Sequence, residues 1–309
     1  MIEQNIIITE SCTNLRMLGR NALAGKWKVT IIAMIIYVLV LNFPPTVFDA
    51  LFGLNPGSVI TGGETYGLDV NTYSAIYNNM PTYSLLSAIY VMLIAGSLEL
   101  GQCILFLAAF RKHDIKATDI FLGFERFGKA LMLLIYQTVF IMLWTFLLII
   151  PGIIAAYRYS QAFYILADDP DKSIKQCMDE SKAMMRGNKW KRFVLELSYI
   201  GWLILAYFPA AFLNGIGQLV TDNTFVLSVI SIIASLFTVP VSVYMMSSFA
   251  GFYEILAGHL IKETKPVPVT VQEAIEMKHE LEQLPEATEE TPKAVEEPEV
   301  SEAPEDDNK

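Results

Sequence analysis

Six long apolar runs constrain this chain more than any other feature of its sequence. They cover residues 29–43, 83–110, 130–150, 152–167, 193–213 and 225–260. A helix needs about 20 apolar residues to cross a bilayer. Of the 309 residues, 53% are apolar and only 17% are charged, which excludes an ordinary soluble domain. The sequence therefore predicts an all-α, polytopic membrane protein with six transmembrane helices arranged in three hairpins.

Proline and glycine set the predicted limits of these helices. Pro44-Pro45 should end the first helix, because proline lacks the N–H that a helix interior needs. Pro151-Gly152 should form a tight turn between the third and fourth helices. The sixth run is too long for one crossing, so we expect Pro240 to kink it and its last turns to project beyond the membrane.

Basic residues are distributed unevenly between the two sides of the predicted bundle. Loops 44–82 and 214–224 contain no Lys or Arg, whereas the segments on the other side, 1–28, 111–129 and 172–192, contain four, five and seven. Cytoplasmic loops of membrane proteins carry the excess of Lys and Arg. We therefore predict that both termini are cytoplasmic.

The net charge of −10 belongs to the C-terminal end of the chain. From Lys262 onward there are fifteen acidic and five basic residues, whereas residues 1–261 carry seventeen of each. The predicted organisation is an amphipathic segment at 1–28, a membrane domain at 29–261 and a disordered acidic tail at 262–309. The tail could dock a protein partner or only be solvated, and no nucleic-acid-binding face is predicted.

Residues 172–186 alternate apolar and charged positions with helical spacing. A basic loop with a tryptophan follows, which is typical of the membrane interface. We predict a helix on the inner membrane surface, although a linker helix packed on other loops would show the same pattern. The residues predicted to contact anionic lipid headgroups are Lys172, Lys175, Lys182, Arg186, Lys189, Lys191 and Arg192.

Two charged residues, Glu99 and Arg158, lie inside apolar runs. Counted from the inner ends of their runs they lie at ~17 and ~14 Å, taking ~1.5 Å per residue. We therefore predict an ion pair between them, with the hydroxyl of Tyr157 or Tyr159 nearby. The pair is interpreted either as a structural contact or as a polar site for a substrate headgroup or a proton.

Three segments carry a resemblance to a known family. They read IPGIIAAYRYSQAFYILADDPD, SKAMMRGNKWKRFVLELSYIGW and ALAGKWKV. With them, the chain from about Asn14 to Ile261 resembles the bacterial six-helix membrane family called domain of unknown function 975. The resemblance implies a six-helix fold in the bacterial plasma membrane, and it implies no catalytic residues.

Residues that carry chemistry are sparse. No phosphate-binding glycine loop, zinc-protease motif or nucleophile elbow is present, and the three cysteines are too far apart in sequence to suggest a disulfide framework or zinc site. We predict no cofactor, no metal and no enzyme activity. The favoured hypothesis is a non-enzymatic protein that organises or regulates partners at the membrane. The alternative is a transporter or lipid-handling protein that uses Glu99 and Arg158.

Overall fold

The computed structural model describes residues 6–53, 84–221 and 223–260, and all the regular elements in these ranges are helices. Most of loop 44–82 and the predicted disordered tail at 262–309 lie outside the described residues. The elements are α1 (Cys12–Ala22), α2 (Trp27–Phe52), α5 (Leu85–Phe110), the 3₁₀ helix η1 (Ala117–Arg126), α6 (Phe127–Leu147), α7 (Ile149–Tyr159), α8 (Ala162–Asp168), α9 (Ile174–Met184), α10 (Lys189–Leu197), α11 (Ile200–Val220), α12 (Thr224–Ser235), the 3₁₀ turn η2 (Leu236–Thr238) and α13 (Val239–Leu256).

Five helical stretches are long and apolar enough to cross a membrane. They are Trp27–Phe52, Leu85–Phe110, Ala117–Leu147, Ile200–Val220 and Thr224–Leu256. The expected break near Pro240 is present, because η2 interrupts the last of these stretches just before that proline. These helices indicate a multi-pass membrane protein, with five candidate spans in the described residues instead of the six predicted.

The predicted fourth span at 152–167 is not one helix. It divides at Ser160–Gln161 into α7, of 11 residues, and α8, of 7 residues. Ser181 of α9 explains the break. Its hydroxyl donates to the Arg158 carbonyl at 2.9 Å and accepts the Gln161 N–H at 3.2 Å, so the groups released at the break are satisfied by another helix.

The prediction that Pro44-Pro45 ends the first helix is wrong. Both prolines lie inside α2, which continues to Phe52. A proline at position 44 leaves the carbonyl of Val40 without its usual donor. The hydroxyl of Tyr90, on the neighbouring α5, donates to that carbonyl at 2.8 Å, so helix packing offsets the missing backbone bond.

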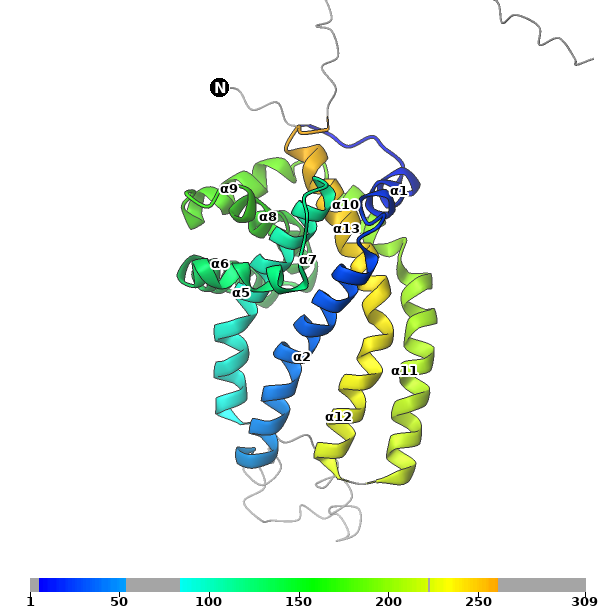
Figure 1. Cartoon of the computed structure of the whole chain (residues 1–309). Helices are drawn as coiled ribbons and strands as arrows, with labels where there is room; N and C mark the ends of the chain where they lie inside the picture. Colours follow the sequence, from blue (N-terminus) through cyan, green and yellow to red (C-terminus); the bar gives the residue numbers. More distant parts are fainter. Residues whose placement is uncertain (1–5, 54–83, 222, 261–309) are drawn as a thin grey trace, which may run out of the picture. The chain divides into compact units, whose positions relative to one another are not determined.

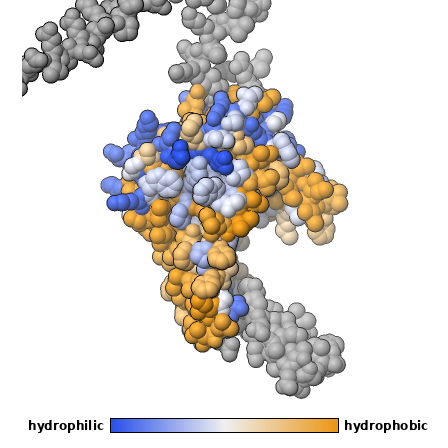
Figure 2. Space-filling view, turned by 90° about the vertical axis from the view of Figure 1, so that its right-hand side faces the viewer, coloured by the Kyte–Doolittle hydropathy of each residue, from blue (hydrophilic) through white to orange (hydrophobic). Residues whose placement is uncertain are grey.

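The helices divide between a packed end and a set of long apolar helices. Figure 1 shows α2, α11 and α12 running alongside one another, with α1, α8, α9, α10 and the end of α13 gathered at one end. We call this end, together with η1 and residues 97–110 of α5, the head. Figure 2 shows hydrophilic residues gathered on the head and apolar residues below it.

Small residues let the helices of the head approach one another closely. A Cβ atom on Gly101 of α5 would overlap the carbonyl of Ile120 in η1, and one on Gly123 would overlap the carbonyl of Ser97. In the same way α1 meets α13, where the Ser247 hydroxyl donates to the Gly19 carbonyl at 2.8 Å. The head is therefore held by contacts that reach the backbone as well as by side-chain packing.

Candidate functional site

Glu99 and Arg158 do not form the predicted ion pair. None of the ion pairs among the described residues joins them. The Arg158 guanidinium instead lies over the ring of Trp144, 5.9 Å from its centroid. The predicted pair requires residues 152–167 to return through the membrane beside α5. Instead α7 packs against α6, so Arg158 lies beside α6.

Tyr157 and Tyr159, the predicted hydroxyl partners, also contact other residues. The Tyr157 hydroxyl donates to Oε2 of Glu196 in α10 at 2.8 Å. Tyr159 is buried, with its ring centroid 6.2 Å from that of Phe140. Neither tyrosine completes a site around Glu99, and both instead hold α7 against its neighbours.

Arg192 was predicted to contact lipid headgroups, and the structure contradicts this. Its side chain is buried, and its guanidinium carbon lies 3.0 Å from the centroid of the Phe249 ring in α13. Its Nε and Nη1 atoms have no hydrogen-bond partner among the described residues. Burial lowers the pKa of Arg192 to about 10. A cation is thus held inside the head with few polar partners, which is an unfavourable environment for a charge.

The reason for this burial can be read from the spacing along the chain. Asn188, Arg192, Leu195 and Tyr199 are all buried, and they recur at intervals of four, three and four residues. Such positions share one face of a helix. Residues 189–192 form a basic cluster in the sequence, which predicts a surface position for all of them. The helical spacing shows instead that Arg192 occupies the buried face.

The other predicted headgroup residues are placed on α9, α10 and the segments that flank them. Lys172 is paired with Glu180, with Nζ 2.7 Å from Oε2, and lies 3.9 Å from Asp169. Lys175, Lys182 and Arg186 are exposed, and Lys189 and Lys191 are half-buried. The face is therefore of mixed charge instead of uniformly basic.

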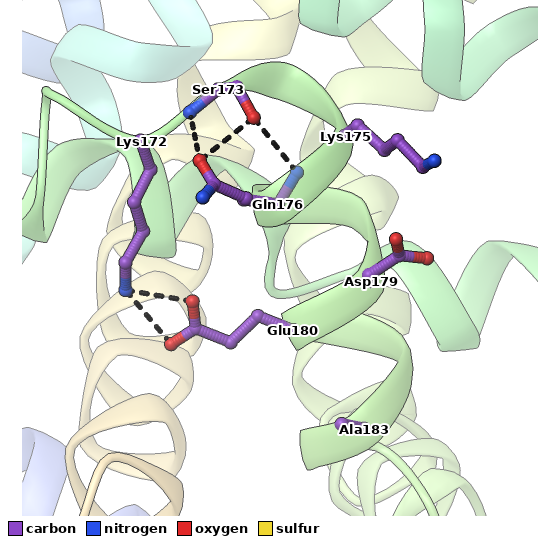
Figure 3. Close-up of a pocket in the computed structure, with 7 residues that line it drawn as sticks. All are labelled: Lys172, Ser173, Lys175, Gln176, Asp179, Glu180 and Ala183. Atoms are coloured by element: carbon purple, nitrogen blue, oxygen red, sulfur yellow. Dashed lines mark hydrogen bonds and ion pairs between the residues drawn. The ribbon is translucent and has the colours of Figure 1, made fainter.

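A groove of about 570 Å³ follows the exposed face of α9 (Figure 3). At its start Ser173 and Gln176 form a capping box, in which the Gln176 N–H donates to Oγ of Ser173 at 3.3 Å and the Ser173 N–H donates to Oε1 of Gln176 at 2.8 Å. Figure 3 shows Lys175 and Asp179 projecting from the same side of the helix. This helix face therefore exposes charged donors and acceptors in a fixed arrangement.

Several ionic groups of the head bind one another instead of facing the groove. Arg111, at the end of α5, contacts Asp168 of α8 at 2.6 Å and Glu254 of α13 at 2.7 Å. Glu254 also contacts Nδ1 of His259 at 2.9 Å, and the Tyr253 hydroxyl donates to Asp168 at 3.0 Å. Burial alone would lower the pKa of Arg111, but the two carboxylates raise it above its ordinary value. This network joins three helices.

A second groove, of about 620 Å³, lies between α2 and α12 in the apolar part of the molecule. Its polar lining residues are Asn42, Thr46, Asp49, Thr224, Ser228, Ser231, Ser235 and Thr238. Asp49 is the one charged residue of this lining, and it accepts the N–H of Ser84 at 2.7 Å. The groove therefore combines hydrogen-bonding side chains with one negative charge.

In the part of the chain that the structure describes, no three His, Cys, Asp or Glu side chains come together as a metal site. Cys103 and Cys177 are buried free thiols, and Cys12 is a half-buried one.

Comparison with known proteins gives one family. The model of the family called protein of unknown function (DUF975) matches residues 145–259, which confirms the resemblance over that stretch. The match includes Arg158, Asp168, Arg192 and Glu254 and excludes Glu99. No curated protein and no solved structure matches the chain.

Proposed function

We propose that this protein is a non-enzymatic, multi-pass protein of the bacterial plasma membrane that organises or regulates a partner at the cytoplasmic face. The uneven distribution of basic residues supports a cytoplasmic head and cytoplasmic termini. One observation carries the proposal: Arg111, Asp168 and Glu254 bind one another across three helices of the head, around a tightly packed centre. A rigid body of this kind is suited to presenting a surface.

The packing around Glu99 supports a platform more than a carrier. Its sequence neighbours in α5, Leu98 and Leu100, are fully buried, and two residues after Glu99, Gly101 meets the backbone of η1. A carrier that used Glu99 would need a polar path at this level, and on the side of α5 that carries Gly101 the helices are in backbone contact. In this proposal Glu99 has a structural role.

The surface that we assign to the partner is the exposed face of α9. Lys175 and Lys182 are exposed there beside Asp179, and the mixed charge suits a protein partner of complementary pattern. The adjoining segment carries Lys189, Lys191 and the exposed ring of Trp190, which suit anionic headgroups at the membrane interface. Headgroups would then position the face that the partner contacts.

Native mass spectrometry of protein released from its own membrane tests this proposal. We expect a retained protein partner, lost in the charge-reversal variant Lys175→Glu/Lys182→Glu. The matched control is Lys28→Glu/Lys116→Glu, which changes the net charge equally at two exposed lysines away from α9. Equal retention of the partner in both variants would refute the assignment to α9.

A second candidate function, transport or handling of an amphiphile, is favoured by the groove between α2 and α12. Its hydroxyls and the carboxylate of Asp49 suit a lipid-like molecule with an amine or hydroxyl headgroup. A retained small molecule in the same spectra, lost in Asp49→Asn but kept in the control Asp114→Asn on the exposed surface of the head, would favour this function.

A further inference from the structure

The hairpin of α6 and α7 presents an apolar tip that is not covered by any described part of the chain. Around the turn, the exposed fraction is 68% for Met142, 91% for Phe146 and 73% for Ile150. The one polar side chain near the turn, Thr145, donates to the carbonyl of Ile141 in its own helix. Such a surface is stable in hydrocarbon or against another apolar surface, and unfavourable in water.

This hairpin does not run along the long helices. Helix α6 meets α5 at Ala130, whose carbonyl a Cβ on Gly96 would overlap. Away from that contact and from the head, both helices expose apolar side chains. The exposed fraction is 50% for Met92 of α5 and 62% for Leu143 of α6. Two helices that stayed in contact would cover one another here. Figure 1 shows α6 lying across the direction of α2 and α11, and Figure 2 shows apolar surface projecting sideways at the lower edge of the head.

Polar contacts hold the base of the hairpin in the head. The Lys129 ammonium donates to the carbonyl of Pro170 at 2.6 Å, which anchors the start of α6 to the turn before α9. The Ser181 hydroxyl of α9 donates to the Arg158 carbonyl, and Tyr157 donates to Glu196 of α10. The end of α7 is thus fixed to two short amphipathic helices. With both ends anchored, the transverse direction of the hairpin is set by the head.

We infer that the α6–α7 hairpin is not a pair of membrane crossings but lies within the leaflet on the side of the head, with its tip among the acyl chains of that leaflet. Acyl chains are the occupant that fits, because the exposed side chains are apolar around the turn and on both helices near it. Basic groups at the base, Lys129 and Lys189, lie where anionic headgroups of the same leaflet would be.

The hairpin begins and ends at the head. If α6 and α7 are not counted as crossings, every other segment therefore stays on the same side of the membrane. Four crossings then remain, made by α2, α5, α11 and the α12–α13 stretch. The uneven distribution of basic residues is equally consistent with four crossings and with the six that were predicted. The inference goes beyond the proposed function. If α6 and α7 both spanned the membrane, this inference would be refuted and the proposed function would stand.

Depth measurements by spin labelling in nanodiscs test the inference. Labels are placed at Met132, Val139 and Ile150, all exposed, and depth is read from relaxation by oxygen against a water-soluble nickel complex. Cys12 is replaced by Ser, and the other two native thiols are buried. In an upright hairpin α6 would rise ~24 Å from Met132 to the turn at Leu148, and Ile150 on α7 would lie ~3 Å back. The first and last labels would then differ in depth by ~21 Å, at ~1.5 Å per residue. The in-plane hairpin predicts a difference smaller than one helical turn, ~5.4 Å.

Helix α11 supplies the matched control. Labels at Leu205, Phe212 and Leu219, also exposed, should change in depth by ~21 Å across the same membrane. A comparable gradient along the hairpin would overturn the inference and establish two further crossings. Low oxygen access at Ile150 with spin–spin broadening between copies would overturn it too, because the tip would then contact a second copy of the chain.

Discussion

The two halves of α5 have similarly apolar sequences and very different surroundings. In the half that belongs to the head, Leu98, Leu100 and Leu105 are fully buried, whereas in the other half Leu85 is 78% exposed and Met92 is 50% exposed. The buried half contains the glycine and serine at which η1 approaches the backbone. Apolar character therefore places both halves out of water, and small residues decide which half packs against protein.

The largest effect should come from filling the close contact between α5 and η1. Gly101→Ala would force its Cβ against the Ile120 carbonyl, which cannot move without shifting η1. We expect a loss of about 3 kcal/mol in the stability of the head. Gly215→Ala in α11, where nothing lies within 4 Å, should change stability by less than about 1 kcal/mol. Thermal unfolding in detergent compares the two, and equal effects would contradict the distinction between head and long helices.

Breaking the ionic network should have the next largest effect. Arg111→Gln removes the guanidinium from Glu254, whose side chain is 3% exposed, and leaves it His259 as its one remaining basic contact among the described residues. Because the Arg111 side chain is itself 31% exposed, we expect a loss of about 2 kcal/mol, below the range for fully buried pairs. Lys172→Gln removes a pair near the surface and should cost less than about 1 kcal/mol. The same unfolding assay checks both, and a reversed order would mean that the network does not hold the head together.

Arg192→Met should have a smaller effect, of opposite sign. It removes a buried cation with few polar partners and keeps a side chain of similar length over Phe249. Replacing buried charges by apolar groups is often neutral or stabilising, so we expect a gain of about 1 kcal/mol. Chemical unfolding in detergent measures it. A loss above about 2 kcal/mol would show that Arg192 has a favourable partner in the native protein, such as a bound anion.

The smallest effect concerns pH. Burial raises the pKa of the Cys177 thiol in α9 from 9.0 to about 11, so the folded head favours the neutral thiol. The unfolded chain releases this proton at lower pH. The contribution of Cys177 is therefore complete below about pH 9 and is lost as the pH rises towards 11. The unfolding temperatures of wild type and Cys177→Ala should converge as the pH rises through this window. A constant difference between the two temperatures would contradict a raised pKa for the Cys177 thiol.

The sequence was sufficient for the class of fold and for several local features. Apolar runs predicted an all-α membrane protein, helical spacing predicted α9, and Pro240 predicted the break at η2. It was not sufficient where another helix supplied the missing interaction. The hydroxyls of Tyr90 and Ser181 decide that α2 continues through two prolines and that α7 ends at Tyr159. Such partners lie far away in sequence, so local rules mispredicted both.

The candidate site was predicted less well for a similar reason. The ion pair between Glu99 and Arg158 depended on the assumption that all apolar runs are parallel, and the transverse hairpin removes that assumption. Arg192 was placed on the surface because clusters of basic residues usually are exposed. The network around Arg111 joins residues from three distant segments, and only the folded chain brings them together.

We propose that the protein meets its partner at the α9 face of the head and not at the groove among the long helices. Photo-crosslinking in living cells tests this most directly, with benzoylphenylalanine placed at Lys182 on α9 or at Ser231 in the groove. We expect a protein adduct at position 182 and no adduct beyond bulk lipid at position 231. A specific small-molecule adduct at position 231, with no protein adduct at position 182, would contradict it and establish the groove as the functional site.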